Sequence, residues 1–446
     1  MISMIKRAKL FPCVLLLALL LHVPLMAQDV PQVFRGALIY PIVGEPIEKG
    51  VLVVQGGKIV AVGKASEVQV PAGAVEHNVE GKVILPGLVD THSHIGRGDG
   101  GDASGTLHPS VRILDAIDPR ATNFKKALVG GITTVNVMPG SGHLMSGQTV
   151  YLKLRKNANK IEDMLFVKDA TNDIAGGLKM ANGTNPLRPA PFTGTRGKSA
   201  AAVRMIYLKA QDYREKIKAA GGDKEKLPKR DLDMECLVQA LEGKRIVHHH
   251  THRHDDILTV LRLAKEFGFR VVLHHVSEAW KVAKEIAEAK APCSIIVLDA
   301  PGGKLEAVDI RFENGRVLEE AGVDVAFHTD DGITDSRFFL RSAGLAVRAG
   351  MSRKKALEAL TLAGARMLDL QDRIGSLEKG KDADFIILSG DPFSVYTHVL
   401  QTWVEGQKVY DRANSDDYKY ATGGYAVYRG ADALDDNGQS EMGGER

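Results

Sequence analysis

The sequence predicts an α/β fold in which a barrel of parallel strands is joined to a smaller β-rich domain. Between residues 84–368, apolar strand-like runs are followed by longer segments with helical periodicity. Repeated strand-then-helix units indicate a parallel sheet, and this many units over about 285 residues favour a closed barrel over an open sheet. Residues 28–83 and 369–412 carry short β-rich runs instead, so we expect both ends of the chain to form one domain.

The first 27 residues are expected to be a secretory signal peptide. Three basic side chains within residues 6–9 precede the apolar run Leu10–Leu21, and Ala27 offers a small residue at a cleavage site. The alternative is an uncleaved membrane anchor, but an apolar run of about a dozen residues is shorter than the roughly 20 that a span needs. We therefore expect a secreted, periplasmic protein without a stable membrane span after cleavage.

The composition is that of a chain that can bury a large core. Of its 446 residues, 44% are hydrophobic and 25% are charged, which excludes a disordered or collagen-like protein. The formal charge of +3 comes from the three basic side chains of the leader, so the mature chain is neutral and no nucleic-acid partner is expected. Cys236 and Cys293 are too few for a disulfide framework, and we expect both to be buried as small apolar residues. The sequence leaves open whether the chain forms a homo-oligomer.

Strands of the β-rich domain are predicted by short apolar runs between turns. These runs are Ala37–Tyr40, Gly50–Val54, Lys58–Gly63, Ala383–Leu388 and Val399–Val409. We expect the last two to complete the sheet begun by the first three. The polar, glycine-rich tail 413–446 is expected to be flexible and disordered.

Strands of the barrel are predicted from longer apolar runs. They are Leu85–His94, Ile132–Met138, Arg245–His250, Arg270–His275, Ser294–Leu298 and Val323–Phe327. In a parallel barrel the reactive side chains gather where these strands end. The glycine-rich segment 96–105 follows the first strand and is expected to cover that end of the barrel.

Imidazole and carboxylate groups recur at four of these strand ends. His92 and His94 end the first strand, and residues two apart on an extended chain project to the same side, so both rings can reach one ion. The fifth strand ends in the tract 248–254, the sixth in His274-His275, and the eighth is followed by Asp330. Clustered buried polar groups are costly unless they are paired or bound to metal, so this pattern predicts a metal site. The alternative is that the histidine tract is merely compositional.

These motifs resemble those of a known family. Residues 83–94 resemble the entry motif of the amidohydrolase superfamily, and residues 33–411 resemble its imidazolonepropionase-like branch. The resemblance implies a distorted TIM (β/α)8 barrel with divalent metal, and a small composite β-sandwich domain formed from both ends of the chain. By motif position it also implies a set of metal ligands: His92, His94, His250, His275 and Asp330. His252 could face the same way as His250 and is the alternative ligand of the fifth strand.

The number of metal ions depends on the fourth strand. The resemblance implies that two-metal members carry a bridging carboxylated lysine or glutamate there, and Lys179 is the candidate metal ligand at that position. The alternative is a solvent-facing lysine. Relatives in this branch tend to show Gly-Glu-Asn-Pro where this chain has Gly183-Thr184-Asn185-Pro186, and the lost acid counts against a second ion. One or two ions are therefore left open; zinc is expected, although iron, nickel and manganese suit the same ligands.

The resemblance implies hydrolysis of a carbon–nitrogen bond, in an amide or cyclic amide of a small-molecule substrate, by metal-activated water. Asp330 is expected to accept the water proton and return it to the leaving nitrogen, and His275 to bind metal or hold the developing oxyanion. His328 is a candidate for orienting one of these groups. His143 and Arg204 could contact substrate, although solvation of a loop and of a helix surface is the ordinary explanation for them. The alternatives for the whole protein are a dipeptidase of the prolidase kind and a non-catalytic secreted binding protein.

Overall fold

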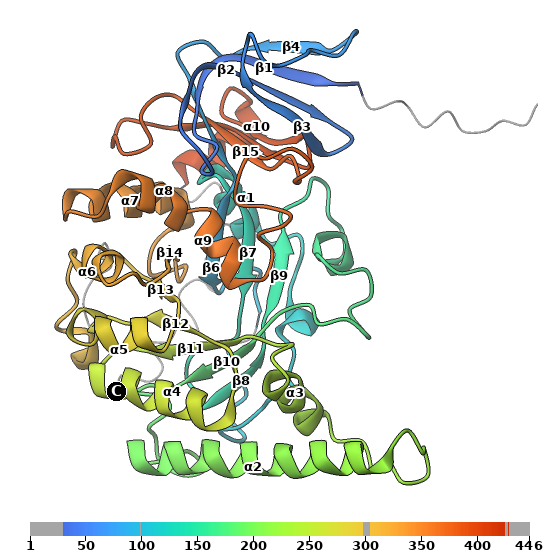
Figure 1. Cartoon of the computed structure of the whole chain (residues 1–446), viewed down its shortest axis with the longest axis vertical. Helices are drawn as coiled ribbons and strands as arrows, with labels where there is room; N and C mark the ends of the chain where they lie inside the picture. The colour runs from blue at the N-terminus through green and yellow to red at the C-terminus, as the bar shows by residue number, and fades with distance from the viewer. Residues whose placement is uncertain (1–29, 99, 298–303, 424–426, 428–446) are drawn as a thin grey trace, which may run out of the picture.

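Two regions with different strand pairing make up the chain, a mostly antiparallel β-rich region and a region of parallel strands flanked by helices (Figure 1). The computed structural model describes residues 30–98, 100–297, 304–423 and 427. The expected signal peptide lies outside the described residues. Within these ranges, no helix combines the length and the apolar character that crossing a membrane requires.

One eight-stranded sheet forms the β-rich region and contains both ends of the described chain. Its strands are β1 (Gln32–Ile39), β2 (Ile47–Gln55), β3 (Lys58–Lys64), β4 (Val75–Asn78), β5 (Val83–Pro86), β15 (Phe385–Leu388), β16 (Val399–Val404) and β17 (Gln407–Asp411). They follow the order β17-β16-β15-β5-β1-β2-β3, with β4 paired to β1. The C-terminal strands join the N-terminal ones where β15 runs antiparallel to β5. The rings of Phe34, Phe385 and Trp403 pack against one another inside this sheet.

The second region is mixed α/β and contains two further sheets. Its strands are β6 (Leu88–Ser93), β7 (Ile132–Val137), β8 (Met145–Gln148), β9 (Val150–Lys153), β10 (Leu178–Ala181), β11 (Val247–Thr251), β12 (Val271–His275), β13 (Cys293–Ile295) and β14 (Val325–Phe327). One sheet has the order β14-β13-β12-β11-β10-β8 and the other β6-β7-β9. The neighbours from β10 to β14 are all parallel, so their carboxyl ends lie along one edge. The backbone N–H of Asp330 donates to the carbonyl of His92 at 2.9 Å, which brings the end of β14 beside β6.

Helices cover the outside of these strands. They are α1 (Thr122–Val129), α2 (Arg196–Ala220), α3 (Leu232–Leu241), α4 (His254–Phe267), α5 (Ala283–Glu288), α6 (Asn314–Glu320), α7 (Phe339–Arg348), α8 (Arg353–Ala359) and α9 (Leu362–Met367). The long helix α2 begins where the Thr195 side chain accepts from the Lys198 N–H and ends at Gly221, whose φ of 56° closes the last turn. Cys236 and Cys293 are both buried with free thiols, as expected.

Two expectations about element bounds are wrong. The predicted strand Leu85–His94 is divided at Gly87, between Pro86 and Leu88. The backbone at Gly87 passes so close to Thr133 that a Cβ would lie 2.1 Å from its Oγ1. The chain therefore leaves the β-rich sheet at Gly87 rather than at residue 83. The tail predicted to be disordered from residue 413 contains helix α10 (Ser415–Thr422), which is capped by Asn414 and packs Tyr420 and Ala421 on the core.

Candidate metal centre

The end of β6 places two imidazoles side by side. His92 is fully buried on the strand, and its Nε2 lies 3.3 Å from the Nε2 of His94. The Nδ1 of His94 is 2.8 Å from the carbonyl of Met138, which fixes the ring and directs its Nε2 towards His92. The two rings face the same side, as the spacing of two residues predicts.

Asp330 completes a group of three with these histidines. Its Oδ1 lies 3.1 Å from Nε2 of His94 and 3.5 Å from Nε2 of His92. Ligand atoms about 2.0–2.2 Å from a tetrahedral zinc ion are about 3.3 Å from one another, so these three spacings suit one ion. The donor types, two imidazoles and a carboxylate, are also those that zinc accepts.

A second group of three comes from β11 and β12. Ring nitrogens of His250, His252 and His275 all lie within 4.8 Å of one another. Among the described residues, Nδ1 of His250 and Nε2 of His275 have no hydrogen-bond partner although they are buried. Orphaned buried nitrogens of this kind indicate a place for a ligand such as a metal ion. His252, the alternative on the fifth strand, thus lies beside His250 in the same group.

Lys179 lies on β10 and is fully buried, so the solvent-facing alternative is wrong. Its Nζ is 3.0 Å from Nε2 of His92 and 3.0 Å from Sδ of Met138. The fourth-strand lysine is therefore in contact with the first group of ligand candidates.

The histidines of the centre are held in their neutral form. Burial, with Lys179 and neighbouring imidazoles adding positive charge, holds the pKa of His92 well below its usual range. Burial and the surrounding imidazoles do the same for the pKa values of His250 and His275. Because a metal binds the neutral imidazole, this environment and the donor spacings fit a divalent ion. The role of each residue as a ligand remains a prediction.

Other buried histidines line the same space. Nε2 of His328 is 3.2 Å from Nδ1 of His275, and its Nδ1 is 2.8 Å from Oγ of Ser294, so His328 lies close enough to orient His275. His274 was not singled out from the sequence, yet its Nε2 is 2.9 Å from Nδ1 of His248. Strict alternation lets only one of two consecutive residues face inward, but His275 has a φ of 68°, outside the strand range. No feature of the sequence indicates this departure of His275 from strand geometry.

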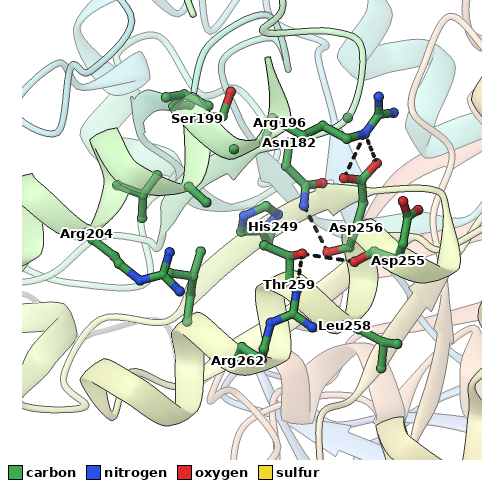
Figure 2. Close-up of a pocket in the computed structure, with 17 residues that line it drawn as sticks. Asn182, Arg196, Ser199, Arg204, His249, Asp255, Asp256, Leu258, Thr259 and Arg262 are labelled. Carbon is green, nitrogen blue, oxygen red and sulfur yellow. Dashed lines mark hydrogen bonds and ion pairs between the residues drawn. The ribbon is translucent and has the colours of Figure 1, made fainter.

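A cleft of about 370 Å³ opens on the other face of β11, between α2 and α4 (Figure 2). His249 lines it, whereas His250 belongs to the metal candidates, as alternation on a strand requires. Two of its charged side chains are paired: Arg196 binds Asp256 at 2.9 Å, and Arg204 binds Glu266 at 2.8 Å. The cleft contains none of the ligand candidates, and Arg204 is the solvated helix residue that one interpretation expected.

The chain is similar to known proteins in sequence and in structure. Residues 83–410 match the sequence profile of the Amidohydrolase family. The crystal structure of an amidohydrolase from Thermotoga maritima MSB8 is similar with a TM-score of 0.78 at 34% identity, covering 85% of this chain and 100% of that one. Such neighbours imply a TIM barrel together with a β-rich domain.

Two curated relatives are more distant. An imidazolonepropionase of Bacteroides fragilis is 25% identical over 418 residues, which is 82% of this chain and 92% of the relative. An amidohydrolase of Hapsidospora irregularis is 24% identical over 426 residues, or 85% of this chain. This chain spans only 43% of the length of that second relative.

Proposed function

The chain belongs to the amidohydrolase family and is a hydrolase acting on carbon–nitrogen bonds, and from this premise we propose that it cleaves an amide or cyclic amide of a small molecule. Members of the family generally depend on a divalent metal ion. We propose zinc here, held by the first-group residues His92, His94 and Asp330 and by the second-group histidines.

The position of Asp330 between the two histidine groups is the observation that carries this proposal. Its Oδ1 faces His94 at 3.1 Å, and its Oδ2 is 3.9 Å from Nδ1 of His275. A carboxylate that joins two clusters of neutral imidazoles can ligate on one side and exchange protons on the other. A packing role would not require the strained backbone of Asp330, whose φ is 50°.

The chemistry follows from these positions. A bound divalent ion would polarise the substrate carbonyl and lower the pKa of its water to about 7. Asp330 accepts a proton at a carboxylate oxygen and later releases it to the leaving nitrogen, acting first as base and then as acid. Neutral His275, next to Oδ2 of Asp330, is suited to hold the oxygen on which negative charge develops.

We further propose that Lys179 is carboxylated and joins two ions. An ammonium group 3.0 Å from His92 would repel a cation bound there, whereas reaction of the neutral amine with CO2 gives a carbamate and a proton and makes the side chain anionic. Thr184 stands where relatives carry an acid, and its backbone N–H donates to Oε2 of Glu306 at 2.7 Å. The loss of that acid counts against a second ion, so the proposed bridge depends on the carbamate of Lys179 alone.

The test is elemental analysis of the purified mature protein. We expect two zinc ions per chain in the wild type, one in Lys179→Ala, and a reduced content in His250→Ala. His249→Ala is the matched control, because it lies on the same strand but faces the cleft of Figure 2. A wild type without bound metal would overturn the proposed function, while one ion in both the wild type and Lys179→Ala would overturn the bridge alone.

Secretion is proposed on the basis of residues 1–27, with their basic start and apolar core. Mass spectrometry of the protein exported by its host should give a mature chain that begins at Gln28. Recovery of the uncleaved chain from the cytoplasm would contradict this proposal.

A further inference from the structure

Three loops that follow β6, β7 and β10 meet in a cluster of aromatic and basic side chains, which we call the loop cluster: Thr106, His108, His143, Arg188 and Phe192. The ring of His143 lies 5.6 Å from that of His108 and 5.4 Å from that of Phe192, measured between centroids. The guanidinium carbon of Arg188 lies 3.7 Å from the centre of the Phe192 ring. Arg188 Nη2 donates to the carbonyl of Gly142, which ties the third loop to the second.

The loop cluster contains buried polar atoms that the protein itself does not satisfy. His143 is only 5% exposed, and apart from a bond to the backbone of Asp102 its ring has no hydrogen-bond partner within the described ranges. Nε2 of His108, Nε of Arg188 and Oγ1 of Thr106 are buried without a partner. Buried polar atoms are normally paired, so these atoms gathered in one place indicate a polar ligand rather than packing. The expectation that His143 is a solvated loop residue is therefore wrong.

The charges within the loop cluster indicate which charge its ligand carries. Arg188 has no carboxylate partner among the described residues, and burial is the cause that lowers its pKa. Burial, followed by the charges of Arg188 and His108, lowers the pKa of His143 to about 4, so at pH 7 its ring is neutral and can donate one N–H. Asp102, whose backbone bonds to His143, has an exposed carboxylate that accepts from the Ser104 N–H at 2.7 Å. One unpaired guanidinium with neutral donors around it suits a single carboxylate.

The loop cluster lies close to the candidate metal centre along two chain paths. Nδ2 of Asn185 is 3.3 Å from Nε2 of His250, and Arg188 follows three residues later, at most about 11 Å away between Cα atoms. On the second path, Met138 contacts His94, and Gly142 follows four residues later. A molecule that binds at both places would carry its amide at the metal centre and its carboxylate at the loop cluster.

We infer that the loop cluster is the subsite for a substrate carboxylate, with Arg188 as its ionic partner and the flat face of Phe192 holding the guanidinium in place. This inference rests on the proposed function and narrows its substrates to amides that carry a carboxylate, such as N-acyl amino acids and dipeptides. Gly101 lies directly against the subsite, because a Cβ there would lie 2.5 Å from Cε1 of His143.

Binding should be measured separately from turnover. N-acetyl amino acids and dipeptides, each paired with its C-terminal carboxamide, are titrated calorimetrically into zinc-loaded Asp330→Asn protein, in which hydrolysis is suppressed. We expect the preferred carboxylate to bind about 10- to 100-fold more tightly than its carboxamide, the range for a charge-assisted hydrogen-bonded pair. Adding Arg188→Gln should abolish that preference, and adding Arg188→Lys should restore part of it.

The control and the outcomes keep the two proposals apart. Arg204→Gln removes an equal charge from the exposed surface of α2 and should leave the preference unchanged. Equal binding of carboxylate and carboxamide, or a preference that survives Arg188→Gln, would overturn the subsite, as would the absence of carboxylate binding up to about 1 mM. Selective binding without hydrolysis by the wild type would instead overturn the proposed function and leave the subsite standing.

Discussion

Replacing Lys153 by methionine is expected to destabilise the protein by about 3–5 kcal/mol, the cost of breaking a buried ion pair. Lys153 ends β9 and is fully buried, with its Nζ in an ion pair with Asp382 and 2.9 Å from Oδ2 of Asp384. Glu405 lies slightly farther, at 3.4 Å. The three carboxylates belong to the β-rich region, so this lysine joins the two regions of the chain.

The size of the expected loss of stability follows from the number of buried carboxylates that lose their cationic partner. Asp382 and Glu405 each retain other cationic partners. Oδ2 of Asp384 makes no other hydrogen bond among the described residues, and the side chain is almost fully buried. One carboxylate, that of Asp384, therefore loses the cation in contact with it, which corresponds to one broken buried pair rather than three. Lys226→Met is the control, because its pair with Asp223 is exposed and should contribute less than about 1 kcal/mol.

The assay is urea unfolding of both variants at pH 7 and at pH 4. Burial already raises the pKa of Asp384, and loss of Lys153 raises it further, so the acid becomes protonated at pH 4 and the deficit of Lys153→Met should shrink there. In the wild type, burial raises the pKa of Asp382 but Lys153 and neighbouring cations outweigh it and lower the value to about 2. Its contribution is present above the unfolded pKa near 3.9 and is lost as the pH falls from about 4 to 2. A deficit under about 1 kcal/mol at pH 7, or one that grows on acidification, would refute this reasoning.

Three further predictions concern the site. Asp330→Asn should lower kcat by about 10²- to 10⁴-fold, as expected when a general base is lost. Steady-state kinetics at saturating zinc measure this, and rates equal to those of the wild type would contradict the role of Asp330. Removing metal with a chelator should lower the thermal unfolding midpoint, because buried nitrogens of His250 and His275 then have no partner. Scanning calorimetry with and without chelator checks this, and an unchanged midpoint would argue against a bound ion. Asp90→Asn should cost about 1–3 kcal/mol, since buried Asp90 accepts from both the N–H and the hydroxyl of Thr329, and urea unfolding would measure the loss.

The ligand candidates could be found from sequence because they follow a periodic rule. Side chains two apart on a strand face the same way, and this rule brings His92 to His94 and His250 to His252. It fails at His274 and His275, which are consecutive yet both lie among the inward-facing rings. The failure has a local cause in the backbone, which no pattern of apolar residues encodes.

The alternation of side chains along a strand says nothing about residues in loops. Arg188 and His143 belong to loops whose paths are set by long-range contacts, such as the bond from Arg188 to the Gly142 carbonyl. Solvation is the ordinary expectation for such residues, and only the folded arrangement shows them buried together. The same distinction holds for the fold: strands with clear apolar runs were placed well, whereas α10 is polar in sequence and is stabilised by the core against which it packs.

Backbone strain links the two histidine groups. His275 and Asp330 both adopt positive φ, 68° and 50°, a region that Asp and His tolerate better than most residues but that still costs free energy. Such strain persists only where neighbours enforce it, and the Asp330 N–H is held by the His92 carbonyl while the N–H of Val276 is held by Thr251. The side chains of His275 and Asp330 are therefore positioned by the backbone of β6 and β11 rather than by an ion. It follows that losing one histidine ligand should weaken metal binding while leaving Asp330 in place, which is the preorganisation that catalysis requires.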